Sequence, residues 1–106
     1  MSDRISEILE VLRIVRGSYR QGMSDGVLRN LRMDAVDSVA HSRGIDSTTV
    51  SDKFRRQLKP DISGTREFDV ALQGWLRSGD GRLKAALVKH SVSVDDQRAV
   101  RYFFDS

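Results

Sequence analysis

Residues 35–59, AVDSVAHSRGIDSTTVSDKFRRQLK, decide how we expect this chain to fold. The stretch predicts two short helices, one over 35–43 and one over 47–58. Gly44 lies between them, and glycine is the residue that most readily adopts the left-handed backbone conformation at the end of a helix. The sequence therefore predicts a helix pair that is joined by a tight turn.

Apolar side chains in this stretch are spaced so that the two helices pack at a steep angle. Val50, Phe54 and Leu58 recur every four residues and form one face of the second helix. The small residue Ala40 lies four residues before the turn glycine, where the two helices would cross. These features are typical of a helix-turn-helix, which leaves the opposite face of its second helix free to enter a DNA groove.

That opposite face holds the side chains that this interpretation places against DNA. Hydroxyl groups at the helix start favour a phosphate or a base edge, because the positive end of the helix dipole lies there. Lys53 and Arg56 are expected to share a face and to reach base edges or backbone, and Arg56 is the better bidentate reader of guanine. Arg55 is turned by about 100° from Arg56 and is expected to contact phosphate. The expected nucleic-acid contacts are Arg43, Ser47, Thr48, Thr49, Ser51, Lys53, Arg55, Arg56 and Lys59.

A purely structural helix pair is the alternative interpretation of this segment. Asp52 lies three residues before Arg55 and four before Arg56, so ion pairs across helical turns are also expected. The Asp52 carboxylate would repel phosphate and would limit how deeply the middle of the helix enters a groove. Both interpretations stay open from the sequence alone.

The segment TVSDKFRRQL, residues 49–58, resembles the recognition helix of winged-helix DNA-binding modules in prokaryotic regulators and some restriction-system proteins. Arg43 replaces the apolar residue that is usual before the turn glycine, and Val50 and Phe54 are spaced by four residues instead of three. These departures fit winged-helix variants better than the phage-repressor type. A minimal β wing is accordingly considered at 58–62 or at 91–94.

Charge is distributed unevenly along the chain. The 106 residues include 18 basic and 15 acidic side chains, which gives a formal net charge of +3. Residues 1–42 are neutral, whereas residues 43–59 hold five basic side chains against two acidic ones. The densest positive charge therefore coincides with the helix pair, where a DNA-binding protein needs phosphate contacts.

Apolar periodicity predicts further helices before the pair. The first is expected over 3–16. Residues 18–33 are expected to form either a short helix that Ser24 caps or an ordered loop. Asp34 is expected to cap the helix over 35–43.

More helices are expected after the pair, over 65–77 and up to about His90. Ser93 and Asp96 resemble a capping box at the start of the last helix. The predicted fold class is mainly α, with residues 1–106 forming a single compact domain of five or six helices. The expected core residues are Val36, Val39, Ala40, Val50, Phe54, Leu58, Phe68, Leu72, Trp75 and Leu76.

Catalysis, cofactors and metals are not expected. The chain has no cysteine, so thiolate nucleophiles and cysteine-rich zinc sites are excluded. His41 and His90 are far apart in sequence, and neither belongs to a two-histidine metal motif. The sequence also lacks the G-x-S-x-G elbow of serine hydrolases and the phosphate-binding loop of nucleotide hydrolases.

We expect a cytoplasmic protein. No apolar run approaches the about 20 residues of a membrane span, so no membrane partner is expected. The N-terminal segment MSDRISEILE lacks the basic start and apolar core of a signal peptide.

The leading functional hypothesis is a module that binds double-stranded DNA, such as a small transcriptional or defence-system regulator from a prokaryote or a phage. The alternative is a protein-interaction or assembly module, either an accessory subunit or a domain of a larger protein. Phe103 and Phe104 are adjacent, so a single narrow helical stripe does not bury both. On that basis one of the two rings is expected to cover either a homodimer contact through the terminal helices or a domain that follows.

Overall fold

The computed structural model describes residues 3–58, 62, 65–91 and 93–105, and the side chains at 3, 4, 57 and 65 are outside the description. Within these residues the chain is helical and has no strand, which confirms the mainly α fold class. The helices are α1 (Asp3–Ser18), α2 (Asp25–Arg43), α3 (Ser47–Leu58), α4 (Thr65–Ser78), α5 (Arg82–Lys89) and α6 (Val94–Asp105).

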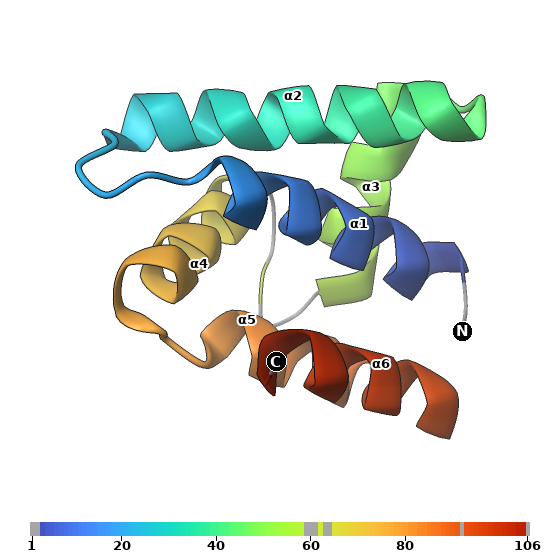
Figure 1. Cartoon of the computed structure of the whole chain (residues 1–106). Coiled ribbons are helices and arrows are strands. Elements are labelled where there is room, and N and C mark those ends of the chain that lie inside the picture. The colour runs from blue at the N-terminus through green and yellow to red at the C-terminus, as the bar shows by residue number, and fades with distance from the viewer. Residues whose placement is uncertain (1–2, 59–61, 63–64, 92, 106) are drawn as a thin grey trace.

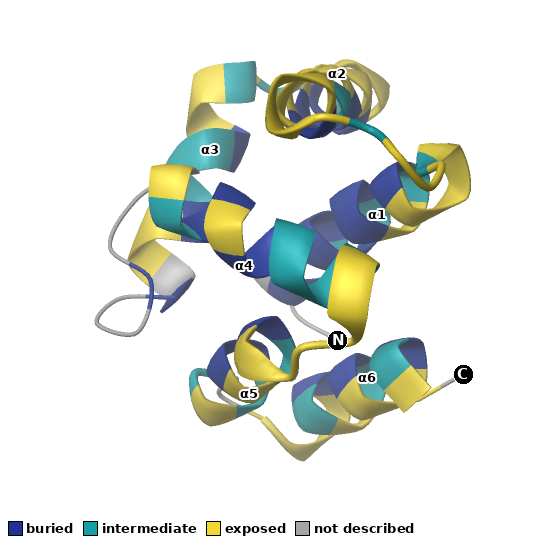
Figure 2. Ribbon diagram, turned by 90° about the vertical axis from the view of Figure 1, so that its left-hand side faces the viewer, coloured by how far each residue is buried: buried dark blue, intermediate teal, exposed yellow. Residues whose placement is uncertain are grey.

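α3 lies at one side of the molecule, where its inner face packs against four other helices (Figure 2). Figure 1 shows α2 along one side with α1 next to it, and α3 running steeply from the end of α2 toward the level of α6. α3 contacts α1, α2, α4 and α5. These contacts fit the four-residue apolar period of α3, because Val50, Phe54 and Leu58 are all buried on the face that meets the other helices.

A single apolar cluster draws buried side chains from every helix. In Figure 2 the buried segments of the helices lie mainly toward the centre of the molecule. The expected core is confirmed, and within it Trp75 and Leu76 are partly buried and pack against the cluster. Each fully buried side chain of this kind stabilises the fold by roughly 1.5–3 kcal/mol.

α2 is one continuous helix, although the sequence indicated a break at Asp34. Ser24 caps its start as predicted, since its Oγ accepts a hydrogen bond of 3.3 Å from the backbone N–H of Val27. The helix then runs from Asp25 to Arg43, so the expected cap at Asp34 is wrong. Asp34 is exposed in the middle of the helix, where its carboxylate stays solvated.

The buried face of α2 explains this continuity. Arg32 lies on that face between Leu28 and Ala35, at a position where the helical period calls for an apolar residue. Its Nε and Nη2 lie 2.8 Å and 3.0 Å from the two carboxylate oxygens of Asp69 on α4. Because Asp69 neutralises the guanidinium, Arg32 can be buried, and the buried face of α2 continues from Leu28 through Arg32 to Ala35.

The C-terminal part agrees with the prediction in its capping, and its two phenylalanine rings both contact Trp75. The backbone N–H of Asp96 donates to Ser93 Oγ at 3.1 Å, as the capping signature indicated. Phe103 is buried and Phe104 is half-buried, and both rings contact Trp75 at centroid distances of 5.8 Å and 5.1 Å. Part of the Phe104 ring is therefore covered within the chain itself.

The two segments considered for a β wing show no strand in their described residues. Residues 59–61 and 92 lie outside the description. The N–H of Ile62 donates to the carbonyl oxygen of Leu58 at 2.7 Å, and Ile62 is buried. Among the described helices, none has both the length and the apolar content needed to cross a membrane.

Candidate nucleic-acid interface

The turn between α2 and α3 has the geometry that its glycine predicts. Gly44 has φ 65° and ψ 32°, in the left-handed region that disfavours L side chains. The N–H of Gly44 donates to His41 O at 3.2 Å, and the N–H of Ile45 donates to Ala40 O at 2.9 Å. These bonds close the end of α2 and turn the chain sharply into α3.

Asp46 caps the start of α3. Its Oδ1 accepts a hydrogen bond of 2.8 Å from the N–H of Thr48. Its backbone carbonyl accepts bonds from the N–H groups of Thr49, at 3.0 Å, and Val50, at 3.3 Å. The Asp46 carboxylate therefore already occupies one of the backbone N–H groups at this helix end, where its negative charge opposes an incoming phosphate. The side chains of Thr48 and Thr49 are exposed.

The outward face of α3 carries Thr48, Thr49, Asp52, Arg55 and Arg56. The guanidinium groups of Arg55 and Arg56 both pair with Asp52, and the contact from Arg56 measures 3.9 Å. The ion pairs of the structural alternative are thus present. The arginine side chains remain 57% and 78% exposed, and exposed pairs of this kind contribute only about 0–1 kcal/mol. The pairs with Asp52 therefore leave much of both arginine side chains accessible to solvent.

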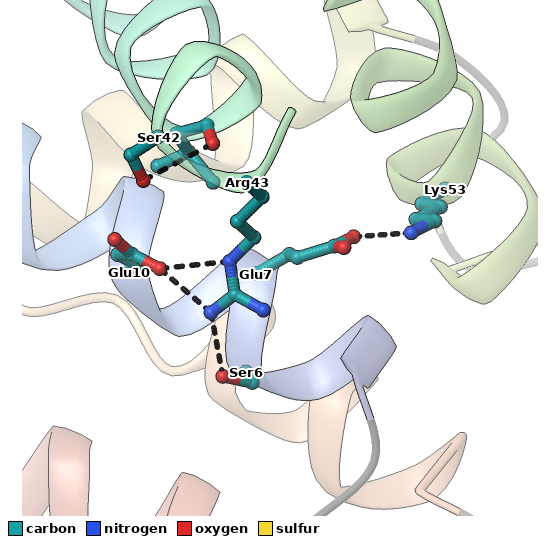
Figure 3. A network of polar contacts seen from close by, with 7 residues as sticks. Ser6, Glu7, Glu10, Ser42, Arg43 and Lys53 are labelled. Atoms are coloured by element: carbon teal, nitrogen blue, oxygen red, sulfur yellow. Dashed lines mark hydrogen bonds and ion pairs between the residues drawn. The ribbon is translucent and has the colours of Figure 1, made fainter. Parts of the chain in front are cut away.

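Lys53 does not share this outward face. Its Nζ lies 2.5 Å from Oε2 of Glu7 on α1, and the Glu7 side chain is only 5% exposed. Figure 3 shows the lysine reaching across to α1. This contact runs against the expectation that Lys53 and Arg56 act side by side, because a buried carboxylate holds the Lys53 ammonium group against α1.

Arg43 also turns toward α1. Its Nε and Nη2 lie 3.1 Å and 2.7 Å from Oε2 of Glu10, and Nη2 donates to Ser6 Oγ at 2.8 Å. The contacts lie next to the Lys53–Glu7 pair (Figure 3). Arg43 therefore ties the end of α2 to α1, away from the outward face of α3.

The other expected contact residues are placed at the edge of this face or outside the description. Ser47 and Ser51 are half-buried and line a shallow pocket of about 210 Å³ against Arg32 and Met33 of α2. Lys59 lies outside the described residues. The structure thus brings together Thr48, Thr49, Arg55 and Arg56 from the nine expected residues.

Sequence reasoning missed the two glutamates that receive these cations. Glu7 lies four residues before buried Val11, on the side of α1 that faces the core. A carboxylate at such a position needs a nearby cation, because burying an unpaired charge is costly. That signal predicts a basic partner without saying which residue supplies it.

The described residues contain no group of three or more histidine, aspartate or glutamate side chains placed to hold a metal ion. Comparisons of the chain with protein families, with curated proteins and with solved structures found no match. The functional argument therefore rests on the geometry of the residues.

Proposed function

We propose that this chain is a non-catalytic module that binds double-stranded DNA through the outward face of α3. The supporting observation is the turn at Gly44, which sets α3 steeply against α2 while its polar face stays in solvent. A helix presented in this way has the width that the major groove of DNA admits.

The side chains on this face fit backbone contacts better than extensive base readout. Arg55 and Arg56 supply the positive charge, and Thr48 and Thr49 supply hydroxyl groups that donate to phosphate oxygens. Asp52 lies between the arginines and opposes a close approach of the helix middle. Binding is therefore expected to be weak for the isolated chain and to fall with salt, because each neutralised phosphate adds about 0.9 to the salt slope.

Nuclear magnetic resonance titration with a short random-sequence duplex, at low and at moderate salt, tests this proposal. The largest amide shifts are expected at residues 46–56 and are expected to shrink at moderate salt. Arg55→Ala and Arg56→Ala should each weaken binding, while Arg29→Ala, which removes an exposed arginine on α2, should not. A titration that leaves α3 unshifted at low salt would end the proposal.

A further inference from the structure

A second surface, distinct from the outward face of α3, lies between α1 and α6. A groove of about 430 Å³ runs between α1 and α6 and reaches the end of α2. Its lining includes Leu9, Arg13, Arg16, Arg43, Tyr102 and Phe103. No described residue of α3 belongs to its lining. Its volume falls within the range of about 300–1,000 Å³ that is typical of ligand sites.

The groove has an excess of positive charge. Arg43 is compensated by Glu10, the acidic residue of the lining, through the contact of 2.7 Å. Arg16 donates from Nη1 to the carbonyl oxygen of Phe103 at 3.3 Å, and its guanidinium lies 4.4 Å from the centre of the Phe103 ring. The Arg13 guanidinium is exposed and lies 6.0 Å from the same ring. Two cations therefore lie beside the groove with no carboxylate partner among the described residues.

The exposed aromatic surface of the groove comes from Tyr102. Leu9 and Phe103 are buried beneath the groove, and Tyr102 is 79% exposed beside it. Tyrosine and arginine are the residues, with tryptophan, that most often dominate the energy of protein–protein contacts. A simple phosphate would leave the exposed Tyr102 ring uncovered, whereas an apolar side chain of a peptide would cover it.

We propose that this groove docks an acidic peptide segment of a partner protein that carries an aromatic or aliphatic side chain. The apolar side chain packs against the exposed ring of Tyr102, and flanking carboxylates pair with Arg13 and Arg16. Arginine suits this partner because its guanidinium binds a carboxylate through two parallel hydrogen bonds. The site is separate from the outward face of α3, so it does not depend on the proposed DNA binding.

Selection of a random peptide library displayed on phage, with the full chain as the target, tests the inference. Enriched peptides are expected to place aspartate or glutamate beside an aromatic or aliphatic residue. A synthetic peptide of the enriched sequence should lose about tenfold or more in affinity with Arg13→Glu or Tyr102→Ala. Arg29→Glu, a matched charge reversal on α2, and Arg55→Ala on α3 should leave its affinity unchanged.

Three outcomes would overturn the inference in variants that keep the helical circular dichroism of the parent chain. The first is a selection without acidic consensus, or one whose peptides bind the Arg13→Glu variant as well as the parent. The second is a loss of duplex DNA binding in the groove variants, which would make the groove a nucleic-acid surface. The third is a concentration-dependent dimer that Tyr102→Ala abolishes, which would make a second copy of the chain the occupant.

Discussion

The rings of Phe54 and Phe68 lie parallel, with their centroids 4.4 Å apart and their planes at 3°. Phe54 belongs to α3 and Phe68 to α4, and both side chains are almost fully buried. Stacked aromatic pairs add about 0.5–1.5 kcal/mol beyond the burial of their surface. This contact holds α3 from the side opposite its solvent-facing residues and so fixes the direction in which they point.

Replacing Phe54 by alanine is expected to lower the free energy of unfolding by about 3–5 kcal/mol, because it removes a large buried ring and leaves a cavity. The total stability of a domain of this size is about 5–15 kcal/mol. The variant should therefore be largely destabilised in chemical denaturation followed by circular dichroism. Tyr102→Ala is the control, since an exposed substitution changes stability by only about 0.5 kcal/mol. An unchanged midpoint for Phe54→Ala would contradict the core assignment.

The buried Arg32–Asp69 pair predicts a non-additive double-mutant cycle. Asp69→Leu alone should destabilise the fold by about 3–5 kcal/mol, because it leaves the buried guanidinium without a counter-charge. The double variant Arg32→Met, Asp69→Leu should recover much of that loss, since similar volumes then pack without charge. Denaturant midpoints of Arg32→Met, Asp69→Leu and the double variant measure the coupling. Additive effects would show that the two side chains act independently.

Gly44→Ala is expected to destabilise the chain by roughly 1–2 kcal/mol, the cost of a left-handed backbone for an L residue. An added Cβ at Gly44 meets no atom within 4 Å, so the penalty is conformational and not steric. Gly17→Ala is the matched control, because Gly17 lies within α1 and its Cβ position is equally open. That change should stabilise the chain by about 0.4–1 kcal/mol. Thermal unfolding should thus show shifts of opposite sign.

Lys53 and Arg56 are predicted to separate stability from binding. Lys53→Met leaves the carboxylate of buried Glu7 without its partner and should lower stability by about 1–3 kcal/mol. Arg56→Ala removes an exposed side chain and should leave stability within about 0.5 kcal/mol while weakening DNA binding. Denaturation and fluorescence anisotropy with labelled duplex, measured below the unfolding transition, check the two effects. A Lys53→Met variant with unchanged stability would argue against the structural role of that ion pair.

Much of the fold was predictable because its signals are local. The bounds 47–58 predicted for the second helix of the pair agree with α3, since Val50, Phe54 and Leu58 mark its buried face through one period. Gly44 could be assigned to the turn for the same reason, because its conformation depends on its own missing side chain. Most of the core followed from such periods.

The errors arise where a distant residue completes a local pattern. Arg32 interrupts the apolar stripe of α2, and its partner Asp69 lies 37 positions later in the chain. Lys53 pairs with Glu7 at a separation of 46 positions. Periodicity within one helix carries no information on such partners. It therefore suggested a break in α2 and did not indicate that Glu7 would draw Lys53 away from the polar face of α3.

The two carboxylates of α1 make the helix pair dependent on a third helix. Glu7 holds Lys53 and Glu10 holds Arg43, on the two sides of the Gly44 turn. A peptide cut to residues 25–58, or a graft of it onto another scaffold, would carry both cations without their counter-charges and would expose the apolar face of α3. The smallest transferable unit for protein engineering therefore includes α1 together with the elements that cover Phe54.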